Sequence, residues 1–108
     1  MSLSDEFMAF VLDQFSGWGG VTARKMFGGA GLFRDGVMFG LIANDVVCLK
    51  VDDSNRPDFI RAGSAPFKPY PDQAASMSYY EVPPEVMEER EILTAWAVRS
   101  LDVARCRE

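Results

Sequence analysis

The chain has 108 residues, a length typical of one domain, and 48% of them are hydrophobic, so a sizeable core needs no metal or disulfide. The formal net charge of −5 favours solubility and opposes a general attraction to nucleic acid or to anionic membranes. Histidine is absent, which excludes Ser-His-Asp and Cys-His catalysis and any zinc site with histidine ligands.

The first predicted element is a helix over about residues 5–16. Ser4 is its expected N-cap, and Asp5 and Glu6 follow in the first turn, where the helix dipole favours negative charge. Apolar side chains recur at helical spacing and form one stripe for packing, at Phe7, Val11 and Phe15. The glycine-rich residues 17–20 end this helix.

Residues 24–51 predict an antiparallel meander. A strand starts or bends near the glycines of residues 28–31. The Asp-Gly pair at residues 35–36 lies between apolar runs and predicts a hairpin, because both residues can adopt positive φ. The Asn-Asp pair at residues 44–45 gives a second, weaker turn. Residues 21–25 are ambiguous by pattern alone.

The last strand of this meander, residues 46–51, is largely apolar on both faces. Its two faces carry Val47, Leu49 and Val51, and Val46, Cys48 and Lys50. One face should pack under helices. The other is too apolar to stay fully wet, so we expect a second helix or a partner subunit to cover it.

A short helix is predicted over about residues 55–62. Its N-cap candidates are Asp52, Asp53 and Ser54. Gly63 suits the position just beyond its C-terminal end. Residues 64–75 contain three prolines and predict a loop with at most one strand fragment.

The C-terminal part predicts one more strand and a long helix. Residues 77–82 are rich in tyrosine and valine and read as a strand, and residues 84–106 predict a helix with a break near Glu89. The acidic residues between 81 and 91 fit a solvated helix start or a surface for a basic partner. Because helices interrupt an antiparallel sheet of about four to five strands, the fold class is α+β, in the order α-β-β-β-α-β-α.

The glycine-rich run Phe27, Gly28, Gly29 invites comparison with phosphate-binding loops. No Gly-Lys-Ser/Thr follows it, and Arg34 occupies the place of the third glycine of a dinucleotide-binding motif. The structural interpretation is a strand bend, a bulge or a close backbone approach.

Three basic residues flank this run without an acidic residue among them: Arg24, Lys25 and Arg34. With Phe27 and Phe33 interleaved, they hint at nucleic-acid binding, in which basic groups contact phosphates and aromatic rings stack on bases. The alternative is a set of solvated charges beside core phenylalanines.

Lys50, Tyr79 and Tyr80 form a second group of candidates. A lysine in an apolar setting can act as a nucleophile, or it can extend its stem along a strand end and keep its charge in water. The adjacent tyrosines point to opposite faces of a strand, so one belongs to the core and the other is free to face a partner. Asp52 and Asp53 fit helix capping better than a metal site, because no further oxygen ligands follow at EF-hand spacing.

The two cysteines, Cys48 and Cys106, lack the spacing of a metal or redox motif. They indicate reduced thiols and a cytoplasmic location, because small secreted domains carry denser cysteine patterns. No apolar stretch suits a signal peptide or the roughly 20 residues of a membrane span, so no membrane association is expected.

Four stretches resemble the TfoX N-terminal domain family, at residues 22–33, 34–39, 48–53 and 77–83. They contain RKMFGG-x-GLF-x-DG-x-MF, LKVDD and SYYEVP, which are specific in combination. The resemblance covers roughly residues 5–105 and identifies residues 1–108 as one domain. The positions that match the motifs are Arg24, Lys25, Phe27, Gly28, Gly29, Gly31, Asp35, Gly36, Lys50, Tyr79 and Tyr80.

The resemblance implies an α+β domain with a secretion-chaperone-like arrangement and a regulatory, non-enzymatic role. TfoX proteins are linked to natural competence and to the expression of DNA-uptake genes together with the cyclic-AMP receptor protein. It implies no catalytic residues and no cofactor. Full-length competence regulators continue into a second helical domain, so a stand-alone N-domain is expected to share the fold and a binding surface, with the pathway left open.

Three hypotheses follow for the function. The first is a protein-interaction domain in transcription regulation, whose partner belongs to the transcription machinery or is a second copy of the chain. The second is direct nucleic-acid binding through the basic, glycine-rich region, and the third is a small-molecule or enzymatic site near Lys50 and the tyrosines. The candidate binding surface comprises Arg24, Lys25, Phe27, Gly28, Gly29, Arg34, Lys50, Tyr79 and Tyr80.

Overall fold

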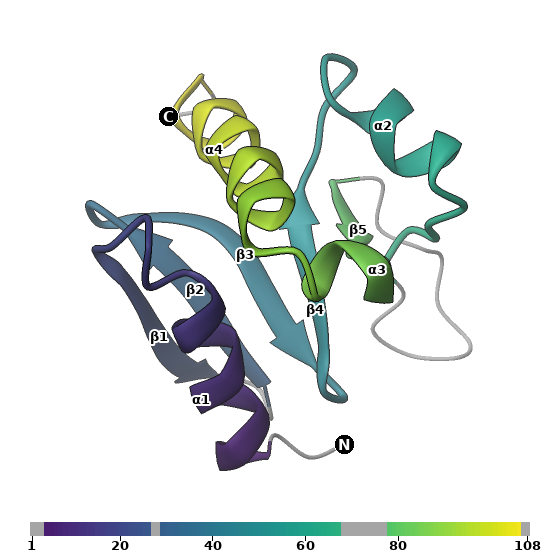
Figure 1. The fold of residues 1–108 in the computed structure, drawn as a ribbon. Helices are drawn as coiled ribbons and strands as arrows, with labels where there is room; N and C mark the ends of the chain where they lie inside the picture. Colours follow the sequence, from purple (N-terminus) through teal and green to yellow (C-terminus); the bar gives the residue numbers. More distant parts are fainter. Residues whose placement is uncertain (1–3, 27–28, 68–77, 107–108) are drawn as a thin grey trace.

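The structure is a computed structural model that describes residues 4–26, 29–67 and 78–106. Within these residues, five strands form one antiparallel sheet whose spatial order follows the chain (Figure 1). The strands are β1 (Val21–Met26), β2 (Gly29–Arg34), β3 (Val37–Ala43), β4 (Val46–Lys50) and β5 (Tyr79–Glu81). The helices are α1 (Asp5–Gln14), α2 (Arg56–Arg61), α3 (Pro84–Met87) and α4 (Arg90–Cys106). The expected α+β class and the order of its elements are confirmed.

Both predicted turns connect neighbouring strands. Asp35 and Gly36 have φ of 55° and 77°, the left-handed conformation that lets a short turn follow the twist of the flanking strands. Asn44 and Asp45 adopt the same region, with φ of 53° and 56°. The ambiguous residues 21–25 belong to β1, because they pair along their whole length with β2.

The helix ends follow the sequence with one exception. The Ser4 hydroxyl accepts a hydrogen bond from the Phe7 N–H at 3.1 Å, so the predicted N-cap of α1 is confirmed. Gly63 lies just beyond α2 with φ of 78°, as predicted. The long C-terminal helix is interrupted, because α3 ends at Met87 and α4 starts at Arg90.

The predicted N-cap of α2 at residues 52–54 is wrong. Asn55 occupies the N-cap position, and its side chain makes no capping hydrogen bond. The Asn55 amide instead accepts from the Asp52 N–H at 2.8 Å and donates to the Lys50 carbonyl at 3.1 Å. Asn55 is buried, and its amide forms hydrogen bonds with two backbone groups where β4 ends. If the side chain capped α2 instead, these two backbone groups would have no hydrogen-bond partner.

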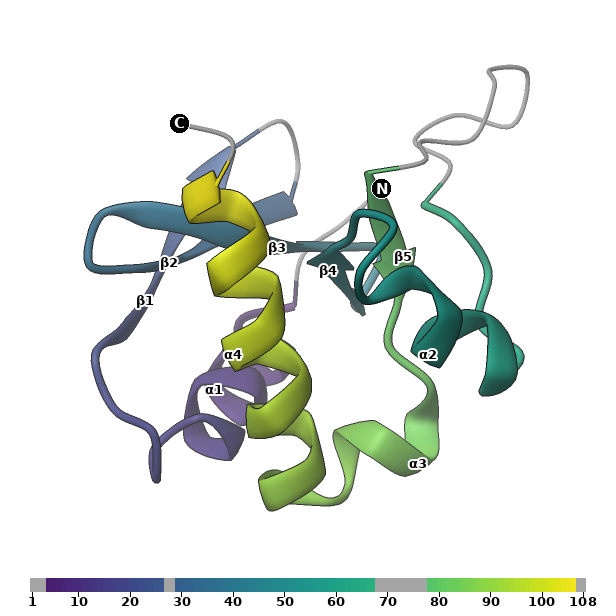
Figure 2. The ribbon, with the colours of Figure 1, turned by 90° about the horizontal axis from the view of Figure 1, so that it is seen from above.

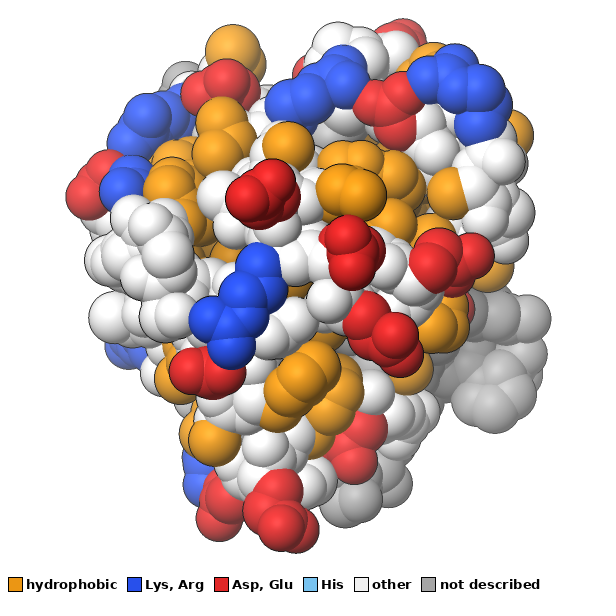
Figure 3. All heavy atoms as spheres, viewed as in Figure 1, with side chains coloured by type: hydrophobic (Ala, Val, Ile, Leu, Met, Phe, Trp, Pro, Cys, Tyr) orange, Lys and Arg blue, Asp and Glu red, His pale blue; other side chains and the backbone are white. Residues whose placement is uncertain are grey.

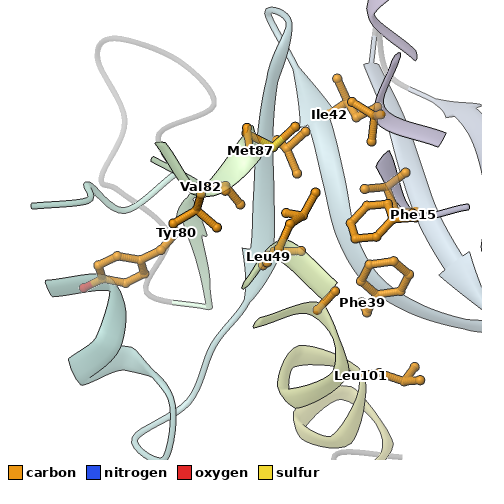
Figure 4. Close-up of a cluster of buried hydrophobic side chains, with 14 of the residues drawn as sticks. Phe15, Phe39, Ile42, Leu49, Tyr80, Val82, Met87 and Leu101 are labelled. Atoms are coloured by element: carbon orange, nitrogen blue, oxygen red, sulfur yellow. The ribbon is translucent and has the colours of Figure 1, made fainter. Parts of the chain in front are cut away.

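All the described helices lie on one face of the sheet (Figure 2). The core between them and the strands includes Phe15 at the C-cap of α1, Phe39 from β3, and Leu93 and Leu101 from α4 (Figure 4). The Phe15 and Phe39 rings meet edge to face, with centroids 5.7 Å apart. Each such buried side chain contributes roughly 1.5–3 kcal/mol, so this layer fixes which sheet face turns inward.

A buried polar contact joins two helices beneath the sheet. Gln14 at the end of α1 is 6% exposed, and its Nε2 donates to the Met87 carbonyl at 2.7 Å. The contact satisfies a carbonyl where α3 ends, and it positions α1 against α3. Nothing in the apolar pattern of α1 predicts a buried glutamine.

Candidate interaction surface

The sheet face opposite the helices carries no helix in the part of the chain that the structure describes (Figure 2). Strand alternation and pairing assign one row of residues across it: Arg24, Gly31, Leu41, Cys48 and Glu81 are direct neighbours on successive strands. We call this surface the open face. It comprises Thr22, Arg24, Met26, Gly29, Gly31, Phe33, Met38, Leu41, Ala43, Val46, Cys48, Lys50, Tyr79 and Glu81.

The centre of the open face is apolar and closely packed. A Cβ added at Gly31 would lie 2.9 Å from the Phe33 ring, 3.0 Å from Met26 Cε and 3.3 Å from Met38 Sδ. These three side chains therefore close over the glycine, and each remains half-buried rather than fully covered. The result is a smooth apolar surface with polarizable methionines, a composition that adapts readily to a binding partner.

Gly29 shows why the glycine-rich run is needed. A Cβ at this position would lie 2.2 Å from the Ile42 carbonyl oxygen, a distance that no real contact allows. The interpretation of a close backbone approach is therefore confirmed at Gly29. Phe27 and Gly28 lie outside the described residues.

A cation packs on an aromatic ring at each side of the open face. The Arg24 guanidinium lies 5.6 Å from the centre of the Phe33 ring, across β1 and β2. The Lys50 ammonium lies 4.9 Å from the centre of the Tyr79 ring, across β4 and β5. Each such contact contributes about 0.5–1 kcal/mol at an exposed site and holds the cation over the face. Burial also raises the pKa of Tyr79, so its phenol stays neutral and can donate a hydrogen bond.

The structure does not bring the predicted basic residues together. Lys25 follows Arg24 on β1, so it points to the helical side and pairs with Asp5 of α1 at 3.2 Å. Arg34 also lies on the helical side, where its guanidinium stacks 4.5 Å from the Trp18 ring and its Nε donates to the Gly19 carbonyl at 2.8 Å. Of these three residues, Arg24 is the one on the open face.

The side chains of Tyr79 and Tyr80 lie on opposite faces of β5, as strand alternation predicts. Tyr80 is 4% exposed and packs in the core against Phe59 of α2, with ring centroids 6.0 Å apart (Figure 4). Tyr79 is the direct cross-strand neighbour of Lys50 on the open face. The structure therefore brings Lys50 and Tyr79 together and separates both from Tyr80.

Cys48 lies on β4 next to Leu41 in the row across the open face, and 1% of its surface is exposed. Burial, together with the nearby Glu81 carboxylate, raises the pKa of its thiol to about 12. The thiol therefore stays protonated at neutral pH, which makes it a poor nucleophile and a poor metal ligand. Among the described residues, no group of three or more acidic or cysteine side chains is placed to hold a metal ion.

Two grooves of the described surface lie away from Lys50 and the tyrosines. A groove of about 320 Å³ has Phe7, Phe10 and Met87 among its lining residues, and Phe10 is 42% exposed. A second groove of about 530 Å³ lies where α1 ends and α4 begins, beside Trp18 and Arg90. Neither is lined by Lys50, Tyr79 or Tyr80.

The helical side has a different surface character. In Figure 3, acidic side chains are scattered among hydrophobic ones, and most groups of basic side chains lie beside an acidic one. Such a surface offers no continuous positive field for nucleic acid. The open face remains the best candidate surface among the described residues.

Sequence reasoning missed three of the residues that shape the open face. These residues are Met26, Met38 and Leu41. The signal that could have found them is strand alternation on either side of the Asp-Gly turn. That alternation is broken in β3, because Leu32 pairs with Gly40 and Phe33 with Met38, so Phe39 has no partner in β2; only the pairing reveals this register shift.

No helix of the described chain combines the length and apolar character needed to cross a membrane.

Comparison with known proteins identifies the family of this chain. A search of curated proteins finds no match. The family model for the TfoX N-terminal domain matches residues 13–104, a span that includes every strand and nearly all of α4. The chain therefore belongs to the TfoX N-terminal domain family.

Proposed function

We propose that this chain is a non-enzymatic protein-interaction domain of transcription regulation, that it acts in the cytoplasm, and that its open face is the docking surface. The observation that carries the proposal is an apolar sheet centre, formed by Phe33, Met38 and Leu41, that no described helix covers. Removing apolar surface from water contributes about 25 cal/mol per Å², so such a face favours a protein partner.

Two further observations support a binding role over a catalytic one. The cysteine on this face has its pKa raised to about 12, so it is a weak nucleophile. The lysine on this face packs on the Tyr79 ring, where its charge is held by the π-system. Membership of the TfoX N-terminal domain family supports a role in transcription regulation.

Direct nucleic-acid binding is the second candidate, because one observation favours it. Phe33 and Tyr79 lie on the open face of a sheet beside Arg24 and Lys50, and single-stranded nucleic acid binds to sheets through aromatic stacking and basic side chains. Glu81 on the same face and the net charge of −5 both oppose it. We therefore rank it below protein binding.

Site-specific photo-crosslinking separates these candidates. A diazirine amino acid of leucine's size replaces Leu41 on the open face, and in a matched control it replaces Ala95, which is exposed on α4. After irradiation in cells, we expect protein adducts from position 41 and none from position 95. Nucleic-acid adducts at position 41 would favour the second candidate, and an absence of adducts there would refute docking through the open face.

A further inference from the structure

Arg24 and Glu81 occupy opposite ends of the central row of the open face. Arg24 lies on β1 and Glu81 on β5, at the same level along the strands. Four strand spacings separate them, which is about 19 Å, so they cannot pair within one chain. Among the described residues, neither side chain has an ion-pair partner. Leu41 lies midway between them on β3.

We propose that the open face binds a second copy of this chain, related by a twofold axis along β3, so that Arg24 of each protomer meets Glu81 of the partner subunit. This inference rests on the proposed function and names its partner. The axis exchanges β1 with β5 and β2 with β4, and it places Leu41 against Leu41 of the partner subunit. One row of residues thus supplies an apolar centre and two ion pairs at its ends.

The charges of Arg24 and Glu81 favour the twofold axis along β3 over a twofold axis perpendicular to the strands. A face-to-face dimer can also form about an axis perpendicular to the strands, which places β1 over β1 and β5 over β5. That arrangement brings Arg24 near Arg24 of the partner subunit, and Glu81 near Glu81 of the partner subunit. Like charges at an interface oppose binding, whereas the axis along β3 converts the same residues into attractive pairs.

The second row of the face agrees with this arrangement. Phe33 on β2 and Lys50 on β4 lie at a similar level along the strands, on either side of Met38. The axis along β3 therefore brings the Phe33 ring toward the Lys50 side of the partner subunit, where an aromatic ring and an ammonium group attract.

The size of the face sets the kind of dimer. Five strands about 4.8 Å apart and roughly six residues long give a face about 20 Å across in each direction. Two such faces bury on the order of 1,000 Å², which is near the lower limit for a specific interface. A reversible, concentration-dependent dimer is therefore expected, rather than an obligate one.

Charge reversal tests the arrangement directly. Sedimentation velocity is measured on the full chain from about 1 to about 500 μM, for the wild type, Arg24→Glu, Glu81→Arg and an equimolar mixture of the two variants. Each variant alone carries two like-charge contacts per dimer and should dimerise at least about tenfold more weakly. In the mixture, both contacts of the heterodimer are again attractive, so dimerisation should return to within about threefold of the wild type.

The controls separate folding from association. Lys25→Glu makes the same charge change on the same strand but on the helical side, so it should leave the dimer unchanged. Thermal unfolding of each variant shows whether it folds. If Glu81→Arg is unfolded, Glu81→Gln serves instead and should weaken the dimer and reduce its salt dependence.

Three results would overturn this inference. A wild-type chain that stays monomeric over the whole concentration range refutes it. In that case, adducts from position 41 to a different protein would still support the proposed function. A wild-type dimer that Arg24→Glu does not weaken, or that the mixture does not restore, shows that the copies associate in another way. If position 41 gives no adducts at all, the proposed function fails together with this inference.

Discussion

Two glycines of β2 are predicted to respond very differently to the same substitution. A Cβ at Gly29 would lie 2.2 Å from the Ile42 carbonyl oxygen, which is backbone of β3. The strands must separate to admit it, and they cannot do so without weakening the β2–β3 ladder. We expect Gly29→Ala to lower the free energy of unfolding by about 3 kcal/mol or more, a large part of the 5–15 kcal/mol typical of a domain.

Gly31→Ala meets side-chain ends instead of backbone. The contacts at 2.9–3.3 Å are with Phe33, Met26 and Met38, which can move by a few tenths of an ångström. Alanine also restricts the unfolded chain, which stabilises by about 0.4–1 kcal/mol and offsets part of the strain. We expect a net change within about 1 kcal/mol, together with an altered open face that associates less well.

Urea unfolding followed by tryptophan fluorescence measures both variants against the wild type. The difference between them should exceed about 2 kcal/mol, or very roughly 8 °C in Tm for a domain of this size. Equal destabilisation by the two substitutions would refute the reasoning, because it would mean that the identity of the contacted atoms does not decide the result.

Three further predictions concern groups that the structure places in defined surroundings. Gln14→Leu leaves the buried Met87 carbonyl without its donor and should destabilise by about 1–3 kcal/mol in urea unfolding, whereas Asp13→Asn, exposed on the same helix, should change stability by no more than about 0.5 kcal/mol. Ser4→Ala removes the N-cap of α1 and should lower stability by about 0.5–2 kcal/mol, with Ser4→Asp restoring most of it. Because the buried Cys48 thiol keeps its proton up to a pKa of about 12, against 9.0 for an ordinary thiol, the unfolded chain ionises first as the pH rises. The free energy of unfolding should therefore fall by up to about 1.4 kcal/mol per pH unit above pH 9, and Cys48→Ala should flatten this dependence in unfolding curves at pH 8 and 10. A pH slope that is the same in the variant would contradict the assignment to Cys48.

Local features of the fold could be predicted because they depend on neighbours in the chain. The Asp35-Gly36 turn, the N-cap at Ser4, the glycine after α2 and the interruption near Glu89 each reflect backbone conformations that a few adjacent residues determine. The α+β class and the family followed from the order of such signals and from the motifs that accompany them. The wrong prediction of the α2 N-cap at residues 52–54 also concerned adjacent residues, because the Asn55 side chain forms its hydrogen bonds at the end of β4 instead of capping the helix.

The composition of the open face could not be predicted, because it depends on pairing between distant segments. Had residues 21–25 been recognised as a strand, alternation alone would have placed Arg24 and Lys25 on opposite faces. No local signal brings Glu81 level with Arg24, however, because that alignment depends on four strand pairings and on a register shift between β2 and β3. The sequence by itself determined the elements, the turns and the family, since these follow from local conformation and residue pattern. Only the tertiary structure decided which side of the sheet α4 covers and which side chains meet on the other side, because burial against a helix and non-local register fix those choices.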